Sequence, residues 1–369
     1  MASIPLRALV RAFRPYTAGL SIDEIRDRYG LSRVIKLASN ENPLGVSPQV
    51  EQALRRHAAY AFRYPQTGNP RLVRALAEHH QVSPSRIVVG NGSDELIDLL
   101  FRVCAEPGVH NAVAFRPCFG IYVTQAALCG VELRQTPLNP DFSFPWKAMR
   151  ELVDETTSLV FVTSPDNPSG HAASVEELAA FARSLPETCL LVVDEAYMDF
   201  TDDESAYSLL PRLEEFPNVA ISRTFSKRFG LAGLRLGYLI LPEVIAEHIW
   251  RVRLPFSVNL LAEEAGLAAL QDHDFLDETY RVVRAGRTYL TAELARLGCT
   301  VTPSQSNFLM FEVPSGLPDA SELFERLLER GVILRPLKSY GLPRHLRVSV
   351  GTEEENHILV SILRELLAK

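Results

Sequence analysis

The feature that most constrains the fold is a series of short, continuously apolar segments that alternate with amphipathic ones. The strand candidates lie at residues 86–89, 111–115, 131–135, 158–163 and 189–193, and all are largely apolar except 131–135, where apolar and polar residues alternate. Helical periodicity occupies intervals between them, at residues 96–103, 120–128, 146–152 and 175–185. Apolar strands that alternate with helices predict an α/β fold with a mostly parallel sheet covered by helices on both faces.

The pattern changes in the last third of the chain. Helical periodicity dominates from about residue 243 to residue 297, and short strand and helix candidates alternate after it. We therefore expect an N-terminal arm at residues 1–33, a large domain at 34–250 and a smaller α+β domain at 251–369. Ser21, with Glu24 three residues later, predicts a capped helix in the arm.

Polar residues follow several of the predicted strands. Asn91-Gly92-Ser93, Asn167, Asp194 with Tyr197, and Ser226-Lys227 all occupy such positions. In open sheets of this kind, ligands bind beyond the carboxyl ends of the strands. These residues are therefore expected to converge on one ligand site.

Lys227 is the most unusual residue among them. Only five of the 38 basic residues are lysines, and Lys227 is set in a polar turn between two buried strand candidates. A lysine shifts its pKa readily when buried and can form a Schiff base, whereas an arginine stays protonated. Lys227 is thus a candidate covalent catalyst, with an ordinary surface lysine as the alternative.

The set of residue types at the strand ends matches what pyridoxal 5'-phosphate requires. This cofactor needs a lysine, an acid at its ring nitrogen, donors to its phenolic oxygen, a phosphate cup and a ring stacked on it. The candidates are Asp194 for the nitrogen, Asn167 and Tyr197 for the phenolic oxygen, Phe119 for stacking, and Gly92, Ser93, Asp94, Thr224, Ser226 and Arg235 for the phosphate. Each of these residues, taken alone, could instead have a purely structural role. Asp194 could cap a strand, Phe119 could be an ordinary core residue, and Ser93 and Asp94 could cap a helix.

Several motifs in order along the chain resemble the fold-type-I aminotransferases. The Asn-Pro turn, Asp-x-x-Tyr, Ser-Lys and an Arg eight residues after that Lys are similar to this class of enzyme. The resemblance narrows to the histidinol-phosphate aminotransferase family and runs from about Tyr16 to the carboxyl end. The motifs that carry it are Ser39-Asn40-Glu41-Asn42-Pro43, Arg63-Tyr64-Pro65, Gly92-Ser93-Asp94-Glu95, Val193-Asp194-Glu195-Ala196-Tyr197 and Leu346-Arg347-Val348-Ser349-Val350-Gly351-Thr352.

The resemblance implies specific roles for residues of this chain. Lys227 would bond to the cofactor and shuttle a proton, with Asp194 and Tyr197 as catalytic partners. Tyr64 would reach the cofactor phosphate of a neighbouring subunit, which implies a homodimer with shared active sites. The residues implied to bind substrate are Tyr16, Asn40, Arg335 and Arg347.

The same resemblance implies an enzyme of histidine biosynthesis. It would transfer an amino group between L-histidinol phosphate and 2-oxoglutarate, giving imidazole acetol phosphate and glutamate. An aromatic aminotransferase and a threonine-phosphate decarboxylase remain alternatives, because both would share the cofactor residues. Ser164, Phe119 and Ser257 depart from residues frequent in the family, and Ser257 lies close to where substrate selectivity is expected.

Composition excludes several other classes of protein. The net charge of −7 offers no basic footprint for nucleic acid, and no apolar run is long enough to span a bilayer. Five cysteines without a C-x-x-C pair indicate reduced thiols and a cytoplasmic protein. No histidines stand at the spacing of metal ligands, and we expect no metal.

Overall fold

The computed structural model describes residues 7, 10, 11, 13, 20–314 and 319–368. Its largest sheet has seven strands in the order β2-β8-β7-β6-β5-β3-β4. These strands are β2 (Ile87–Asn91), β3 (Asn111–Arg116), β4 (Glu132–Pro137), β5 (Thr157–Thr163), β6 (Leu190–Asp194), β7 (Val219–Thr224) and β8 (Leu236–Ile240). Only β8 runs antiparallel to its neighbours β2 and β7; the other pairs of this sheet are parallel. The predicted mostly parallel sheet is confirmed.

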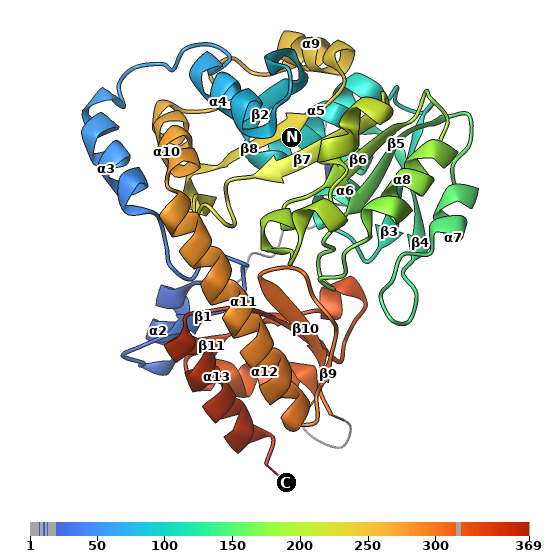
Figure 1. Cartoon of the computed structure of the whole chain (residues 1–369). Coiled ribbons are helices and arrows are strands. Elements are labelled where there is room, and N and C mark those ends of the chain that lie inside the picture. Colours follow the sequence, from blue (N-terminus) through green and yellow to red (C-terminus); the bar gives the residue numbers. More distant parts are fainter. Residues whose placement is uncertain (1–6, 8–9, 12, 14–19, 315–318, 369) are drawn as a thin grey trace, which may run out of the picture.

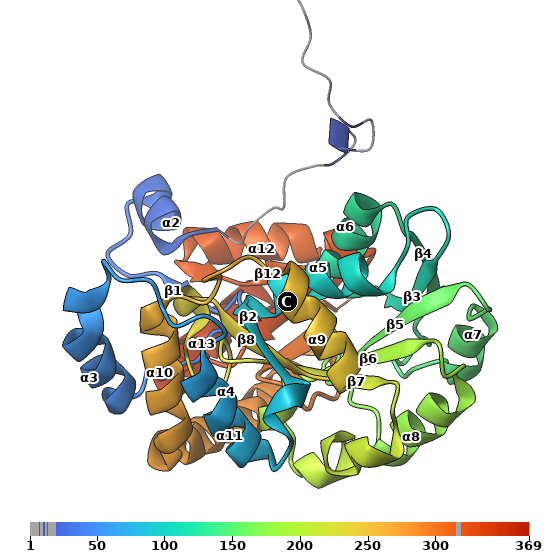
Figure 2. The ribbon, with the colours of Figure 1, turned by 90° about the horizontal axis from the view of Figure 1, so that it is seen from above.

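Helices cover both faces of this sheet because successive strand residues point to opposite sides. In β6, Leu191 and Val193 belong to one buried cluster, and Leu190 and Val192 belong to another. Helices that contribute to the first cluster are α3 (Pro48–His57), α4 (Pro70–His80), α7 (Trp146–Glu151), α8 (Val175–Ser184) and α10 (Leu260–Gln271). Those that contribute to the second are α5 (Gly92–Cys104), α6 (Gly120–Cys129) and α9 (Glu243–Val252). Figure 2 shows α5 and α6 on one side of the strands and α8 on the other.

A second, smaller core surrounds an antiparallel sheet of order β12-β13-β10-β9. Its strands are β9 (Thr300–Val301), β10 (Phe308–Glu312), β12 (Arg335–Pro336) and β13 (His345–Ser349). The helices α12 (Ala320–Glu329) and α13 (Glu353–Leu366) pack on it, and a capping box between Thr352 and Glu355 begins α13. The division of the chain at residues 33 and 250 stays a prediction.

Residues from the start of the chain also join this smaller part. Strand β1 (Ile35–Lys36) pairs in parallel with β11 (Val332–Ile333). Helix α2 (Ile22–Tyr29) begins where Ser21 Oγ accepts a hydrogen bond from the Glu24 backbone N–H. Ile25 of α2 lies in a buried cluster with Leu328 and Ile333. The segment after β1 lies beside the end of β13, where the Ser349 N–H donates a hydrogen bond of 2.8 Å to the Leu37 carbonyl.

Helix α11 (His273–Arg296) connects the two cores. Leu276 in its first turn packs in the large-sheet core, whereas Leu290 and Leu294 pack in the smaller one. The first turn is also held by Arg228, whose Nε donates a hydrogen bond of 3.2 Å to the Leu276 carbonyl. Figure 1 shows α11 running from the level of the large sheet to the side of β10 and α12.

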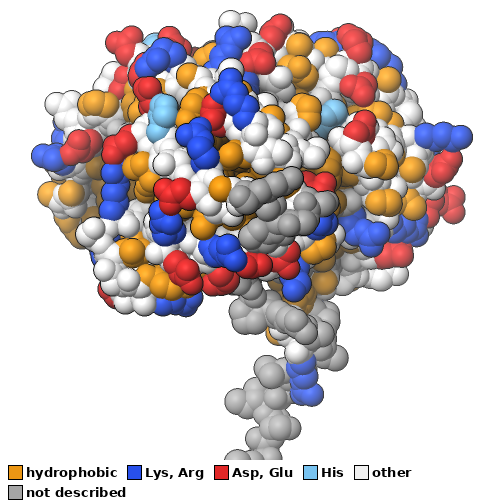
Figure 3. Space-filling view, turned by 90° about the horizontal axis from the view of Figure 1, so that it is seen from below, with side chains coloured by type: hydrophobic (Ala, Val, Ile, Leu, Met, Phe, Trp, Pro, Cys, Tyr) orange, Lys and Arg blue, Asp and Glu red, His pale blue; other side chains and the backbone are white. Residues whose placement is uncertain are grey.

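Charges of both signs are mixed over the surface seen in Figure 3, where Lys and Arg side chains alternate with Asp and Glu. Within the described residues, every helix is too short or too polar to cross a membrane. The same residues contain no cluster of His, Cys, Asp and Glu side chains suited to holding a metal ion.

Candidate active site

The structure brings the predicted strand-end residues together around one cavity of about 150 Å³. The cavity lies at the carboxyl ends of β5, β6 and β7 and at the start of α5. The predicted residues that line it are Ser93, Asp94, Phe119, Asn167, Asp194, Tyr197, Thr224, Ser226, Lys227 and Arg235. Thr163 also lines the cavity, and the sequence analysis did not single it out. Parallel strands place their carboxyl ends at one edge, which explains the convergence.

Lys227 lies in the loop after β7, with its ammonium group inside the cavity. Its Nζ lies 3.4 Å from the Ser39 carbonyl oxygen and 5.6 Å from the centre of the Tyr197 ring. Burial, with the nearby positive charge of Arg347, lowers the pKa of Lys227 to about 8. A lysine with this pKa exists partly as the neutral amine near neutral pH, which is the form that acts as a nucleophile and a base.

Asp194 ends β6 with its side chain buried in the same cavity. Its Oδ2 accepts a hydrogen bond of 2.8 Å from the Tyr122 hydroxyl, and its Oδ1 accepts one of 3.3 Å from the Ala196 N–H. Burial raises the pKa of Asp194 to about 6. Among the described residues no cation lies within ion-pair distance of Asp194, so this buried carboxylate is well suited to a positively charged group on a ligand.

Tyr122 is a residue of this site that sequence reasoning missed. It comes from α6, three residues after Phe119, and its ring meets the Phe119 ring edge-on with centroids 5.9 Å apart. Its hydroxyl also lies 2.8 Å from Thr163 Oγ1. The helical pattern at 120–128 was visible in the sequence. It did not reveal which face of that helix points toward Asp194, because α6 is apolar on most of its surface.

The start of α5 and Arg235 form an anion-binding corner of the cavity. The sequence predicted this helix from residue 96, but it begins at Gly92, directly after β2. Gly92 has a φ of +77°, a conformation that favours glycine and lets the chain turn at once from strand to helix. A Cβ at Gly92 would lie 2.5 Å from Arg235 Nη2, so glycine also makes room for this guanidinium.

Two contacts fix the groups around this corner. Arg235 Nη2 lies 3.1 Å from Asp94 Oδ2, and Thr224 Oγ1 accepts a hydrogen bond of 3.1 Å from the Ser226 N–H. Burial raises the pKa of Asp94. A helix N-terminus beside an arginine fits the phosphate of a cofactor, since both present N–H donors to its oxygens.

The smaller sheet contributes Arg347, which is 6% exposed and lies on β13. Its Nη1 donates to Asn167 Oδ1 at 2.5 Å, and its Nη2 donates to the Ala38 carbonyl at 2.9 Å. Asn40 is also buried, and its Nδ2 donates to the Tyr197 hydroxyl oxygen at 3.1 Å. These predicted substrate residues therefore contact predicted cofactor residues directly.

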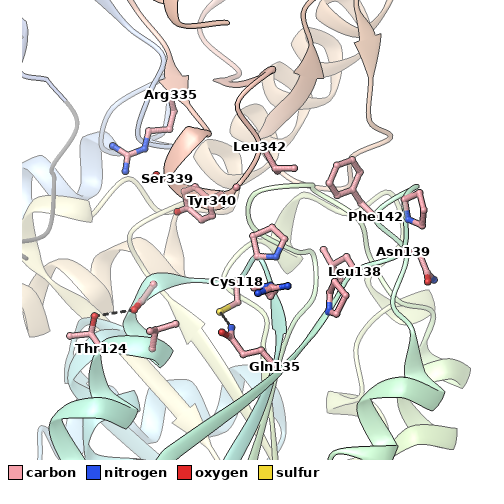
Figure 4. A pocket seen from close by; sticks show the side chains of 17 residues that line it. Cys118, Thr124, Gln135, Leu138, Asn139, Phe142, Arg335, Ser339, Tyr340 and Leu342 are labelled. Atoms are coloured by element: carbon pink, nitrogen blue, oxygen red, sulfur yellow. Dashed lines mark hydrogen bonds between the residues drawn. The ribbon is translucent and has the colours of Figure 1, made fainter. Parts of the chain in front are cut away.

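Two other predicted residues, Arg335 and Tyr64, lie outside this cavity. Arg335 lines a larger cavity of about 860 Å³ beside the first, between β12 and the loop before α6 (Figure 4). Tyr64 is 81% exposed and stacks on Phe256, with ring centres 4.6 Å apart, and it does not line the smaller cavity. Tyr16 lies outside the described residues.

The residues of the cavity fit pyridoxal 5'-phosphate. The lining includes a buried acid for a ring nitrogen, a phosphate corner, a lysine with a lowered pKa, Asn167 and Tyr197 for a phenolic oxygen, and the aromatic ring of Phe119. Residues of the smaller sheet and the loop after β12, such as Arg335 and Tyr340, line the neighbouring cavity.

Comparison with known proteins places the chain in a family. The model of the family described as aminotransferase class I and II matches residues 32–363. Solved structures share the fold: histidinol-phosphate aminotransferase from Sinorhizobium meliloti in complex with pyridoxal-5'-phosphate has a TM-score of 0.88 and 29% identity, covering 99% of this chain and 98% of that one. A double mutant of Thermus thermophilus aspartate aminotransferase has a TM-score of 0.84 and 25% identity over the same shares. This chain belongs to the class I and II aminotransferases and has their fold-type-I architecture.

Sequence relatives within the family narrow the comparison further. The histidinol-phosphate aminotransferase of Nitratidesulfovibrio vulgaris (strain Hildenborough) is 62% identical over 362 residues, which cover 98% of this chain and 96% of that protein. The histidinol-phosphate aminotransferase of Oleidesulfovibrio alaskensis is 58% identical and covers 98% of this chain and 95% of its own length.

Proposed function

We propose that this aminotransferase transfers the amino group of L-histidinol phosphate to 2-oxoglutarate, forming imidazole acetol phosphate and glutamate in histidine biosynthesis. The observation that carries the choice of substrate is the identity of 62% over nearly the whole chain to a relative named histidinol-phosphate aminotransferase. The cavity supports a transamination that depends on pyridoxal 5'-phosphate, because Lys227, Asp194 and the anion-binding corner all line it. The cofactor is pyridoxal 5'-phosphate.

Each group around the cavity has a part in the reaction. Pyridoxal 5'-phosphate, when bound, supplies the electron sink that stabilises negative charge on the substrate carbon. Lys227 Nζ would hold the cofactor at C4′; once the substrate amine had taken its place there, the freed lysine amine would move a proton between the substrate Cα and the cofactor C4′. Asp194 would hold the protonated ring nitrogen, and Tyr122 keeps that carboxylate in place through its hydroxyl. Tyr197 and Asn167 would hold the phenolic oxygen.

The substrate residues sit on the side of the smaller sheet. Arg347 binds the carboxylate of glutamate or the phosphate of histidinol phosphate, and Arg335 and Tyr16 assist it. Asn167 and the Ala38 carbonyl fix the Arg347 guanidinium from two directions, so its fork is oriented before substrate arrives. Positive charge at one end of the pocket serves both substrates, because both carry an anionic group.

A single half-reaction tests the substrate. The purified enzyme with its cofactor is mixed separately with L-histidinol phosphate and with L-phenylalanine, without an amino acceptor, and the cofactor absorbance is followed. We expect histidinol phosphate to change the absorbance at a concentration about a hundredfold lower, since a pocket built around arginines gains most from a dianionic phosphate. Equal or better response to phenylalanine would make the protein an aromatic aminotransferase. Release of carbon dioxide from a phosphorylated amino acid would point to a decarboxylase.

We also propose a homodimer in which Tyr64 reaches the cofactor phosphate of the partner subunit. Tyr64 is exposed and does not line the cavity of its own chain. Its ring stacks on the exposed Phe256, and the apolar side chains nearby in the sequence, Tyr60, Phe62 and Leu254, are exposed as well. Exposed aromatic patches of this kind mark protein interfaces.

Mixing of inactive variants tests this arrangement. Lys227→Ala and Tyr64→Ala chains, unfolded and refolded together in equal amounts, should regain about a quarter of the wild-type activity, because half of the dimers carry one complete site. Lys227→Ala mixed with Arg235→Ala should regain none, since both residues serve the same chain's site. Absence of recovery in both mixtures would argue against a role of Tyr64 across the interface.

The location of the protein is a further part of the proposal. All five cysteines are free thiols, and burial raises the pKa of Cys104, Cys118, Cys189 and Cys299 to about 12. Thiols of this kind are compatible with a reducing compartment. We therefore place the enzyme in the cytoplasm, which cell fractionation can test.

A further inference from the structure

The Tyr197 hydroxyl oxygen receives two hydrogen bonds from side-chain amides. Asn40 Nδ2 lies 3.1 Å from it and Asn167 Nδ2 lies 3.3 Å from it. A phenol oxygen has one hydrogen to donate and two positions that accept hydrogen bonds. When both accepting positions are used by amides, the hydroxyl hydrogen has to point toward a third group.

The orientation of that hydrogen depends on which end of each amide faces Tyr197, and the contacts decide it. For Asn167, the other end of the amide lies 2.5 Å from Arg347 Nη1. A guanidinium only donates hydrogen bonds, so the atom that faces it is the amide oxygen. The nitrogen of Asn167 therefore faces Tyr197.

For Asn40, the deciding residue is Ser349. The backbone N–H of Asn40 donates to Ser349 Oγ at 2.7 Å, and Ser349 Oγ lies 3.0 Å from Asn40 Oδ1. The backbone N–H can only donate, so it takes one of the two accepting positions of the serine oxygen. The buried serine hydrogen still needs an acceptor, and among the described residues the structure gives it the Asn40 amide, because leaving that hydrogen unpaired would cost free energy. The atom of Asn40 that accepts this hydrogen is its oxygen, so the nitrogen faces Tyr197.

All members of this chain of contacts are buried. Asn40 is 1% exposed, Ser349 is 3% exposed and Tyr197 is 5% exposed. The backbone of Asn40 has a φ of +54°, in the left-handed region that asparagine tolerates better than most residues. Its carbonyl accepts a hydrogen bond of 3.1 Å from Asn307 Nδ2. Asn40 is thus held at its N–H, its carbonyl and its side chain.

We propose that Ser349 is a positioning residue that, by fixing the Asn40 amide, turns the hydroxyl hydrogen of Tyr197 into the cavity shared with Lys227. In this orientation the Tyr197 hydroxyl can donate a hydrogen bond to the cofactor but cannot accept one from it. The inference rests on the proposed function, because it concerns how Tyr197 meets the phenolic oxygen of pyridoxal 5'-phosphate. It adds Ser349, a residue of the smaller sheet that does not line the cavity.

Removal of the serine hydroxyl predicts a defined change. In Ser349→Ala, the Asn40 amide loses the partner that distinguishes its two ends and can turn by half a rotation. Its oxygen then faces Tyr197 and captures the hydroxyl hydrogen. Donation to the cofactor's phenolic oxygen weakens, and the anionic form of that oxygen is less stable.

The first readout is the pH titration of the absorbance of the bound cofactor in the absence of substrate. We expect Ser349→Ala to raise the midpoint by about one pH unit, a tenfold shift of the proton equilibrium. The charged and titratable groups around Tyr197 are Arg347, Asp194, Lys227 and Tyr340, and no variant in the series alters them. The turnover number should fall about tenfold, with KM for histidinol phosphate nearly unchanged.

Matched variants separate positioning from general destabilisation. Ser349→Thr keeps the hydroxyl and should restore the wild-type midpoint. Asn307→Ala removes the other buried side-chain contact to Asn40, at its carbonyl, and should lower the melting temperature without moving the midpoint. Ser349→Cys keeps nearly the same volume with a weaker donor and adds no charge next to Tyr197, so it should raise the midpoint in the same direction even where Ser349→Ala fails to fold.

The outcomes are distinct. An unchanged midpoint in Ser349→Ala, or in Ser349→Cys where the alanine variant does not fold, overturns the proposal, as does an equal shift in Asn307→Ala. A wild-type protein that binds no pyridoxal 5'-phosphate would instead contradict the proposed function itself, and the absorbance spectrum of the purified wild-type protein distinguishes this case.

Discussion

The Lys227→Ala enzyme should lose turnover by about a millionfold and should no longer bind pyridoxal 5'-phosphate covalently. Lys227 is the nucleophile and the base of the proposed mechanism, and removal of a residue that does both leaves only binding and polarisation to assist the reaction. The measurement is reduction of the holoenzyme with borohydride followed by intact mass. We expect the cofactor mass on the wild-type chain and none on the variant.

A matched control separates chemistry from charge. Lys227→Arg keeps a cation beside Ser39 but cannot become neutral near physiological pH, whereas burial lowers the pKa of Lys227 to about 8. It should be as inactive as Lys227→Ala while folding normally. Covalent cofactor or wild-type turnover in either variant would remove Lys227 from the mechanism.

The second large effect is expected for Asp194→Asn. The buried carboxylate balances the protonated ring nitrogen, and an amide cannot do so. Turnover should fall by about a thousandfold, as when one preorganised electrostatic contact to a developing charge is removed. The variant keeps an oxygen for the Tyr122 hydroxyl, so the wall of the cavity should stay intact.

The same substitution should stabilise the protein without cofactor. Burial raises the pKa of Asp194 from 3.8 to about 6, so the folded protein binds this proton more tightly than the unfolded chain. The free energy of unfolding therefore falls as the pH rises from about 4 to about 6, and the loss persists above pH 6. Asp194→Asn should be more stable by about 1–3 kcal/mol well above pH 6, and the gain should vanish below about pH 4.

Denaturant unfolding of the cofactor-free proteins at several pH values measures this difference. Tyr122→Phe is a useful comparison, because it removes the hydroxyl that stabilises the Asp194 carboxylate. In that background, the free energy of unfolding should fall further as the pH rises. Equal stability of wild type and Asp194→Asn across the whole pH range would show that the carboxylate is better solvated than its burial indicates.

The sequence predicted the large sheet well because the signals for it are local. Continuous apolar runs specify buried strands, and the carboxyl ends of parallel strands must meet at one edge. These two rules are sufficient to assign Asp194 and Lys227 to one site from the sequence alone. The antiparallel direction of β8 could not be predicted in this way. An apolar run indicates a buried strand, but it does not indicate whether that strand runs parallel or antiparallel to its neighbours.

Side chains that reach the site from other elements were not predictable in the same way. Tyr122 depends on the rotation of α6 about its axis, and that helix is apolar on too many sides for its inner face to be recognised. Ser349 reaches Asn40 only because β13 of the smaller sheet lies against the segment after β1. Such contacts depend on how two cores pack together, which no periodicity within either segment encodes.

The placement of α11 has a mechanical consequence. A helix of 24 residues is about 36 Å long and bends little, so it works as a lever whose short end is clamped in the large core at Leu276. The clamp includes Arg228, the neighbour of Lys227 in the chain. A tilt of about 5° at this fulcrum would swing the far end of α11 by about 3 Å, and the smaller sheet with Arg347 would travel with it. If substrate binds Arg347 as proposed, a pull on that side chain would be transmitted through α11 to the loop that carries Lys227.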